Sequence, residues 1–121
     1  MPKTVMIVDD SASVRQVVSM TLRGAGYEVL EANDGKDALA KLNGKKIGLF
    51  ISDVNMPNMD GISLVKALKG STEHKFTPIV MLTTEGAEAK KQEGQQAGAK
   101  AWIVKPFQPA QLLKVVSTLL G

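Results

Sequence analysis

The chain has 121 residues, of which 44% are hydrophobic and 22% are charged, a composition typical of one globular domain. Its net charge is +3, but the lysines are scattered among acidic residues, which favours solvated surfaces over a nucleic-acid site. Because it has no cysteine, no apolar run near the ~20 residues of a membrane helix and no leader resembling a signal peptide, we expect a cytoplasmic protein without membrane contacts.

Five short apolar runs predict the strands of a parallel sheet, because each has the length of a buried strand and is too short for a helix. The second run is more polar than the others, which predicts a position at the edge of the sheet. The predicted strands cover residues 5–8, 27–32, 47–52, 79–82 and 101–104.

Residues at helical spacing predict a helix after each strand. The helix over 85–97 is the weakest, because it is nearly all polar and includes Gly86 and Gly94. His74 lies in the polar loop over 71–77, and we expect it to be exposed to solvent. The predicted helices begin at or near Ser11 or Ser13, Gly35, Asp60, Glu85 and Pro109.

Strands that alternate with helices through short loops predict a single α/β domain over residues 1–121. We expect a doubly wound, five-stranded parallel sheet, with five helices on its two faces and right-handed crossovers. No internal repeat, linker or low-complexity segment divides the chain.

Polar residues follow the apolar runs at the points where the strands end. The carboxyl ends of parallel strands share one edge of the sheet, and open α/β sheets bind their ligands there. Each residue alone has a simpler explanation: a helix N-terminus for the first two acids, a turn for the third, strand propensity for the threonines and a surface position for the lysine. The residues at this edge are Asp9, Asp10, Asp53, Thr83, Thr84 and Lys105.

Together these residues match the requirements of phosphoryl chemistry. Two carboxylates about 5 Å apart repel by roughly 3 kcal/mol at an effective dielectric constant near 20, so three of them need a proton or a cation. Oxygen ligands of high charge favour Mg²⁺, which also neutralises an incoming phosphoryl group. Asp53 is the best candidate nucleophile, because it is central in the strand order and precedes the most structured loop. Thr83 and Lys105 can contact phosphoryl oxygens, and because no residue is suited to passing the group on, hydrolysis would end the cycle.

The sheet edge and its loops carry a set of motifs that are unspecific singly and strong in combination. They are Asp9-Asp10, Asp53 with Met56-Pro57 and Asp60-Gly61, Thr83-Thr84, and Lys105-Pro106-Phe107. In this order and spacing, the chain resembles the receiver domains of two-component response regulators over essentially its whole length. Among these it is most similar to the stand-alone chemotaxis regulators.

The resemblance implies a flavodoxin-like (CheY-like) fold with strand order 2-1-3-4-5. It implies that Asp53 accepts a phosphoryl group from a phosphohistidine on a sensor histidine kinase. It further implies that the cofactor is Mg²⁺, with a ligand set made of Asp9, Asp10, Asp53 and the backbone carbonyl of Asn55.

The resemblance also assigns residues to the conformational switch. Lys105 would pair with the phosphoryl group, and the hydroxyl of Thr83 would swing inward. Trp102 would then rotate from an exposed to a buried position beside the last strand. The Lys105-Pro106 peptide bond is expected to be cis.

Two further features follow from the resemblance. Asn55 and Glu85 occupy the loop positions that modulate dephosphorylation in this family. The output surface is the face formed by the helix over 85–97, the strand over 101–104 and the closing helix over 109–120.

The partners implied are a CheA-like sensor histidine kinase, a downstream target on that output face and a phosphatase. A flagellar switch protein is the candidate target. The protein would be a monomer, and a phospho-acceptor that promotes its own phosphorylation and autodephosphorylation rather than an enzyme acting on a substrate. A receiver in another pathway, serving as a phosphorelay shuttle or a phosphate sink, is the main alternative.

Three other classes of protein fit the sequence less well. A Mg²⁺-dependent aspartyl-phosphate phosphatase would need a cap domain and a second acid in a D-x-D pattern, and the sequence has neither. A flavodoxin-like cofactor binder would need a phosphate loop where Asp9-Asp10 stands. An adaptor with the same fold that is never phosphorylated would have no need for the intact set of charged residues.

Overall fold

The computed structural model describes residues 3–42, 45–54, 56, 59–84 and 96–120. The strands are β1 (Thr4–Val8), β2 (Glu28–Ala32), β3 (Leu49–Asp53), β4 (Ile79–Thr84) and β5 (Ala101–Lys105). The helices in these ranges are α1 (Ala12–Gly24), α2 (Gly35–Leu42), α3 (Gly61–Lys69) and α5 (Pro109–Leu120).

All five strands form one parallel sheet in the order β2-β1-β3-β4-β5. The predicted fold class and strand order are therefore confirmed. β2 lies at an edge of the sheet, as its more polar sequence predicts. β1, β3 and β4 lie inside the sheet and are buried on both faces, which explains why their sequences are continuous apolar runs rather than alternating ones.

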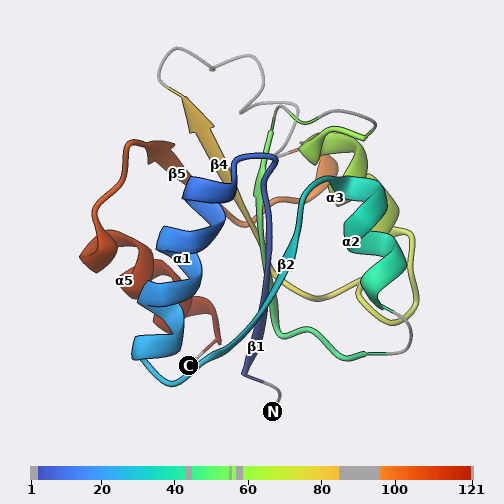
Figure 1. The fold of residues 1–121 in the computed structure, drawn as a ribbon. Coiled ribbons are helices and arrows are strands. Elements are labelled where there is room, and N and C mark those ends of the chain that lie inside the picture. Colours follow the sequence, from blue (N-terminus) through green and yellow to red (C-terminus); the bar gives the residue numbers. More distant parts are fainter. Residues whose placement is uncertain (1–2, 43–44, 55, 57–58, 85–95, 121) are drawn as a thin grey trace.

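Helices cover both faces of the sheet, with α1 and α5 on one face and α2 and α3 on the other (Figure 1). Successive strand residues point to opposite faces, so each strand contributes to two apolar clusters. Ile7 and Ile51 belong to the cluster under α1 and α5. Met6 and Phe50 belong to the cluster under α2 and α3.

Side-chain caps fix where the helices begin. The hydroxyl of Ser11 accepts a hydrogen bond from the backbone N–H of Val14 at 3.3 Å, so Ser11 is the cap of α1. The carboxylate of Asp60 accepts one from the N–H of Ser63 at 2.7 Å and caps α3.

The structure describes four of the five predicted helices. The predicted helix over 85–97 lies outside the described residues except for 96 and 97, which are helical. None of the helices within the described ranges is long and apolar enough to cross a bilayer.

The expectation that His74 is exposed was wrong. Its side chain is buried, and its ring meets the ring of Phe50 edge-on, with centroids 5.4 Å apart and an interplanar angle of 83°. The loop over 71–77 folds back because the Nζ of Lys69 donates hydrogen bonds to the carbonyls of Lys75 and Thr77, at 3.2 and 2.8 Å. A polar loop sequence does not reveal that one of its residues covers the end of a strand.

Candidate functional site

The register of the sheet brings the predicted site residues to one edge. Asp9 directly follows β1, and Asp53 and Lys105 are the last residues of β3 and β5. Asp53 pairs with Leu82 of β4, and the next residue of β4 is Thr83. Residues far apart in the sequence therefore meet because their strands run in parallel and end at similar heights.

Three carboxylates form an acidic cluster at this edge. One oxygen from each of Asp9, Asp10 and Asp53 lies within 4.8 Å of the other two. Asp9 is fully buried, Asp53 is 8% exposed and Asp10 is exposed. The cluster thus has a closed side, formed by Asp9 and Asp53, and a side open to solvent at Asp10.

The ammonium group of Lys105 pairs with both buried acids of the cluster. Its Nζ lies 3.0 Å from Oδ2 of Asp9 and 3.3 Å from Oδ1 of Asp53. Burial lowers the pKa of Lys105, but its hydrogen bonds and ion pairs with Asp9 and Asp53 outweigh burial, so the pKa is raised overall. Lys105 is therefore a cation at neutral pH.

The pKa of Asp53 is shifted in the opposite direction to that of an ordinary ion-paired acid. Burial, and then the negative charge of Asp9, raise the pKa of Asp53 above its usual value, and the pairing with Lys105 does not fully compensate. The ionised form of Asp53 is thus less favourable in the folded chain than in water. A bound group that neutralises the negative charge of Asp53, or spreads it over more atoms, is therefore favoured at this site.

Asp9 is held at every polar atom. Its N–H donates to the carbonyl of Ala32 at 3.1 Å, and its carbonyl accepts from the guanidinium of Arg15 at 2.6 Å. Its carboxylate accepts from the N–H of Ser11 at 2.9 Å through Oδ1 and pairs with Lys105 through Oδ2. These contacts fix the orientation of Asp9 on the buried side of the cluster.

Thr83 and Trp102 lie on the sheet face opposite to Asp53 and Lys105. Trp102 pairs with Met81, and Thr83 pairs with Val104, so the side chains of Thr83 and Trp102 share one face. Thr83 is buried, whereas Trp102 is half-buried against the cluster under α2 and α3. The indole Nε1 of Trp102 is buried and has no hydrogen-bond partner among the residues that the structure describes.

The first residue of α3, Gly61, lies close to the backbone of Asp53. The N–H of Gly61 donates to the carbonyl of Val54 at 2.9 Å, and a Cβ on Gly61 would overlap the backbone oxygen of Asp53. Glycine at this position is therefore required by space rather than by backbone dihedrals. Asn55 and Glu85, which were assigned to metal ligation and dephosphorylation, lie outside the described residues.

Two other features of this edge matter for the assignment. The Lys105-Pro106 peptide bond is cis. An apolar groove of about 430 Å³ lies beside Lys105, and it is lined by Ser13, Val14, Val17, Lys105, Pro106 and Phe107.

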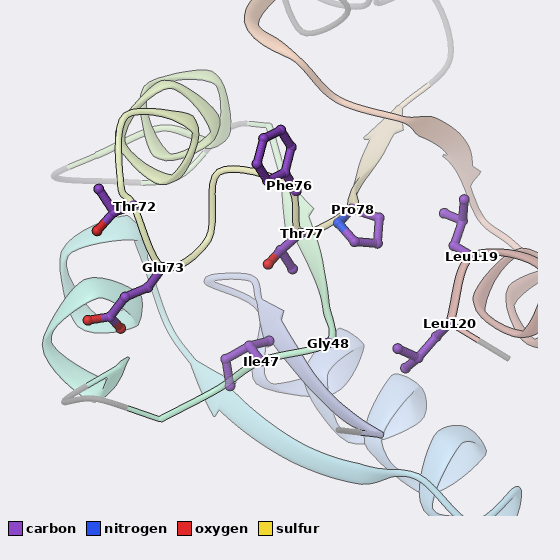
Figure 2. Close-up of a pocket in the computed structure, with 9 residues that line it drawn as sticks. All are labelled: Ile47, Gly48, Thr72, Glu73, Phe76, Thr77, Pro78, Leu119 and Leu120. Atoms are coloured by element: carbon purple, nitrogen blue, oxygen red, sulfur yellow. The ribbon is translucent and has the colours of Figure 1, made fainter. Parts of the chain in front are cut away.

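The cavity in Figure 2, of about 270 Å³, is remote from this site. Ile47 and Pro78 line it just before β3 and β4 begin, and Leu119 and Leu120 line it from the end of α5. It therefore lies at the amino ends of the strands, opposite to the edge that carries Asp53.

The acidic cluster has the chemistry of a Mg²⁺ site. Its ligand atoms are all oxygens, their combined negative charge is high, and one side is open for water and phosphate ligands. When bound, a magnesium ion would offset the repulsion among the carboxylates and neutralise phosphoryl oxygens. Asp9, Asp10 and Asp53 are the side chains that would hold it.

Arg15 is a residue at this edge that the sequence pattern did not reveal. The side chain of Arg15 reaches back from the first turns of α1 to the carbonyl of Asp9, and its Nε pairs with Glu31 of β2 at 3.4 Å. A basic residue in the helix that follows an Asp-Asp pair was the available signal, but the partner strand could not be known from the sequence.

Comparison with known proteins identifies the family of this chain. Residues 5–117 match the family described as "Response regulator receiver domain". Chemotaxis protein CheY1 of Helicobacter pylori is 41% identical over 118 residues, which is 96% of this chain and 95% of that protein. The structure of chemotaxis protein CheY4 of Vibrio cholerae is 52% identical and superposes with a TM-score of 0.93, covering 99% of this chain and 100% of that one.

A relative from another class of regulator is also similar. The phosphate regulon transcriptional regulatory protein PhoB of Pseudomonas aeruginosa is 38% identical over 98% of this chain but only 52% of its own length. This chain thus corresponds to about half of that protein. On the fold, the acidic cluster and these similarities, the chain belongs to the response regulator receiver domain family.

Proposed function

We propose that this chain is a phosphorylation-controlled receiver unit in which Asp53 accepts a phosphoryl group from a sensor histidine kinase in the cytoplasm. The observation that carries the proposal is the contact of Lys105 with both Asp9 and Asp53, at 3.0 and 3.3 Å, beside a third carboxylate. Magnesium would be held by Asp9, Asp10, Asp53 and the carbonyl of Asn55.

The chemistry is a displacement at phosphorus. A carboxylate oxygen of Asp53 attacks the phosphorus of the phosphohistidine, the P–N bond breaks, and its electron pair stays on the imidazole nitrogen. Burial and the charge of Asp9 raise the pKa of Asp53, so a group that neutralises the negative charge of this carboxylate stabilises the site. Lys105, already at the site as a cation, lies within reach of the new phosphoryl oxygens.

Phosphorylation adds negative charge and acceptor oxygens at Asp53. We infer that the hydroxyl of Thr83, which is one residue beyond the strand partner of Asp53, turns toward these oxygens. Thr83 and Trp102 share a face of the sheet, so a shift of Thr83 changes the space available to the half-buried indole. This is the path by which the phosphoryl group would change the surface formed by residues 85–97, β5 and α5.

The downstream role proposed is control of chemotaxis, with a flagellar switch protein as target. Support comes from relatives named chemotaxis proteins that match this chain over 95% and 100% of their own length. A phosphorelay shuttle or phosphate sink would use the same chemistry without that target. Asn55 and Glu85 would set how fast water removes the phosphoryl group.

The apolar groove beside Lys105 offers the kinase a docking surface. A donor domain must bring its phosphohistidine to Asp53, and the groove adjoins the acidic cluster through Lys105. Val17, which lines the groove, is 49% exposed. A Val17→Lys variant should accept phosphate from a small donor at the parent rate and from the kinase more slowly.

The central test is labelling with Mg²⁺ and a small phosphodonor such as acetyl phosphate. We expect one labile phosphoryl adduct, seen by mass spectrometry of the intact protein, that is absent in Asp53→Asn and present in the control Asp37→Asn. Asp37 lies in the first turn of α2 and is not part of the acidic cluster. An adduct of equal yield in Asp53→Asn would overturn the assignment.

The metal assignment is tested by thermal unfolding. Mg²⁺ should raise the melting temperature of the parent, because an ion that binds only the folded chain stabilises it by linkage. Asp10→Ala should remove most of this increase. A melting temperature that is indifferent to Mg²⁺ in the parent would contradict the metal site.

The switch is tested by fluorescence, because Trp102 is the only tryptophan in the chain. Phosphorylation should change its emission in the parent but not in Thr83→Ala, which should still accept the phosphoryl group. An unchanged spectrum in the phosphorylated parent would show that Trp102 does not report the switch.

A further inference from the structure

Arg15 joins three segments of the fold at the acidic cluster. It belongs to α1, its guanidinium donates to the carbonyl of Asp9 at 2.6 Å, and its Nε pairs with Glu31 of β2 at 3.4 Å. Its side chain is only 19% exposed, so the hydrogen bond to the carbonyl is partly shielded from water. The planar guanidinium suits this arrangement because it makes both contacts at once.

The carbonyl that Arg15 binds is part of the peptide unit between Asp9 and Asp10. Asp9 has further restraints, since its N–H and both carboxylate oxygens have partners. The carboxylate of Asp10 has no such restraint: in the described part of the chain, no hydrogen bond or ion pair holds it. It is nevertheless part of the acidic cluster. The direction of the Asp10 side chain therefore depends on the orientation of its backbone.

We propose that Arg15 is a positioning residue. Its guanidinium, held in place by the ion pair with Glu31, fixes the Asp9-Asp10 peptide unit and thereby orients the Asp10 carboxylate toward the cation site. The inference rests on the proposed function, because it concerns the affinity of the same site for Mg²⁺. It assigns a role to a residue that touches neither the cation nor the phosphoryl group.

Charge repulsion by Arg15 alone would change the Mg²⁺ affinity in the opposite direction. A guanidinium close to a cation site repels the cation, so removing its charge should tighten Mg²⁺ binding. Loss of a group that orients a metal ligand instead weakens metal binding, typically by 10–100-fold. The direction of the change in affinity therefore separates a positioning role from a mere neighbouring charge.

The experiment measures the Mg²⁺ dissociation constant by isothermal titration calorimetry for the parent, Arg15→Gln and Arg15→Lys. Both variants should raise the constant about tenfold, Arg15→Lys included, because lysine keeps the charge but lacks the planar fork. The matched control is Arg23→Gln: Arg23 also lies on α1 and donates to a carbonyl of β2, that of Val29, at 3.2 Å. It should leave the dissociation constant unchanged.

Two further variants show whether Arg15 acts through Asp10. In an Asp10→Asn background, Arg15→Gln should weaken Mg²⁺ binding much less than it does in the parent, because the group that it orients is already altered. Glu31→Gln removes the ion pair that holds the Arg15 side chain but leaves Arg15 itself unchanged. It should raise the Mg²⁺ dissociation constant by a smaller factor than Arg15→Gln does. It serves the same purpose if the Arg15 variants do not fold.

The outcomes are distinguishable. Equal or tighter Mg²⁺ binding by Arg15→Gln, or full additivity with Asp10→Asn, would overturn the positioning role while the metal site stands. If the variant lowered only the melting temperature in EDTA, Arg15 would be structural and the inference wrong. A parent that does not bind Mg²⁺ would remove the proposed function and this inference together.

Discussion

The Nζ atom of Lys105 lies 3.3 Å from Oδ1 of Asp53, although β4 separates the strands that carry the two residues. The same nitrogen reaches Asp9, which follows β1 on the other side of β3. One ammonium group thus spans the carboxyl ends of the central strands. It supplies to the buried acids part of the positive charge that a divalent cation would bring.

Replacing Lys105 by Met should destabilise the folded chain, because it leaves two buried carboxylates without their cation. Breaking such a pair costs about 3 kcal/mol. Mg²⁺ should recover part of the loss, and the variant should still accept phosphate but fail to change the emission of Trp102. Denaturant unfolding with EDTA or Mg²⁺ measures the first effect, and the exposed Lys114 of α5, replaced by Met, is the control. Equal stability of the Lys105 and Lys114 variants would contradict the structural role.

Asp53→Asn should raise the melting temperature in EDTA at pH 7. Burial and the charge of Asp9 raise the pKa of Asp53, so the ionised carboxylate costs stability above that pKa, and a neutral isostere removes the cost. The same variant should gain less from Mg²⁺ than the parent. Scanning calorimetry with and without Mg²⁺ tests both statements, and a lower melting temperature in EDTA would refute the first.

The stability of the fold should fall as the solution is acidified below about pH 6.5, the ordinary value for histidine. Burial lowers the pKa of His74 despite the charge of Glu73 and a backbone hydrogen bond with Lys45. The unfolded chain therefore takes up a proton that the folded chain resists, and stability increases as the pH rises through this range. His74 is the only histidine in the sequence.

The pH effect of His74 is best measured in the Asp53→Asn background, because the raised pKa of Asp53 acts in the opposite direction. Melting temperatures between pH 5 and 8 should vary less when His74→Gln is added. An identical pH profile with and without His74 would show that its burial has no energetic consequence.

Gly61→Ala should be poorly tolerated. The new Cβ would overlap the backbone oxygen of Asp53 and lie 2.7 Å from Cε of Met81. The clash should destabilise the chain by about 3 kcal/mol and slow phosphorylation by displacing Asp53. Gly24→Ala is the matched control, because nothing lies within 4 Å of its added Cβ and it should be neutral or slightly stabilising. Similar denaturation midpoints for the two variants would contradict this account.

The sequence by itself determined the fold and the location of the site. Apolar runs of strand length, helical spacing between them and a polar residue after each run are local patterns. A parallel sheet then forces the ends of its strands to one edge, so Asp9, Asp53 and Lys105 could be placed together without coordinates. The register of the sheet shows Asp53 and Lys105 on one face, and Thr83 and Trp102 on the other.

Only the tertiary structure decided which polar residues pair and which are buried. The ring of His74 is buried because its loop folds over Phe50, and Arg15 reaches both Asp9 and Glu31 because α1 packs beside β2. These contacts join residues whose separation in space is set by packing rather than by sequence spacing. Local periodicity carries no information about them, since it states which face a residue occupies and not what lies opposite that face.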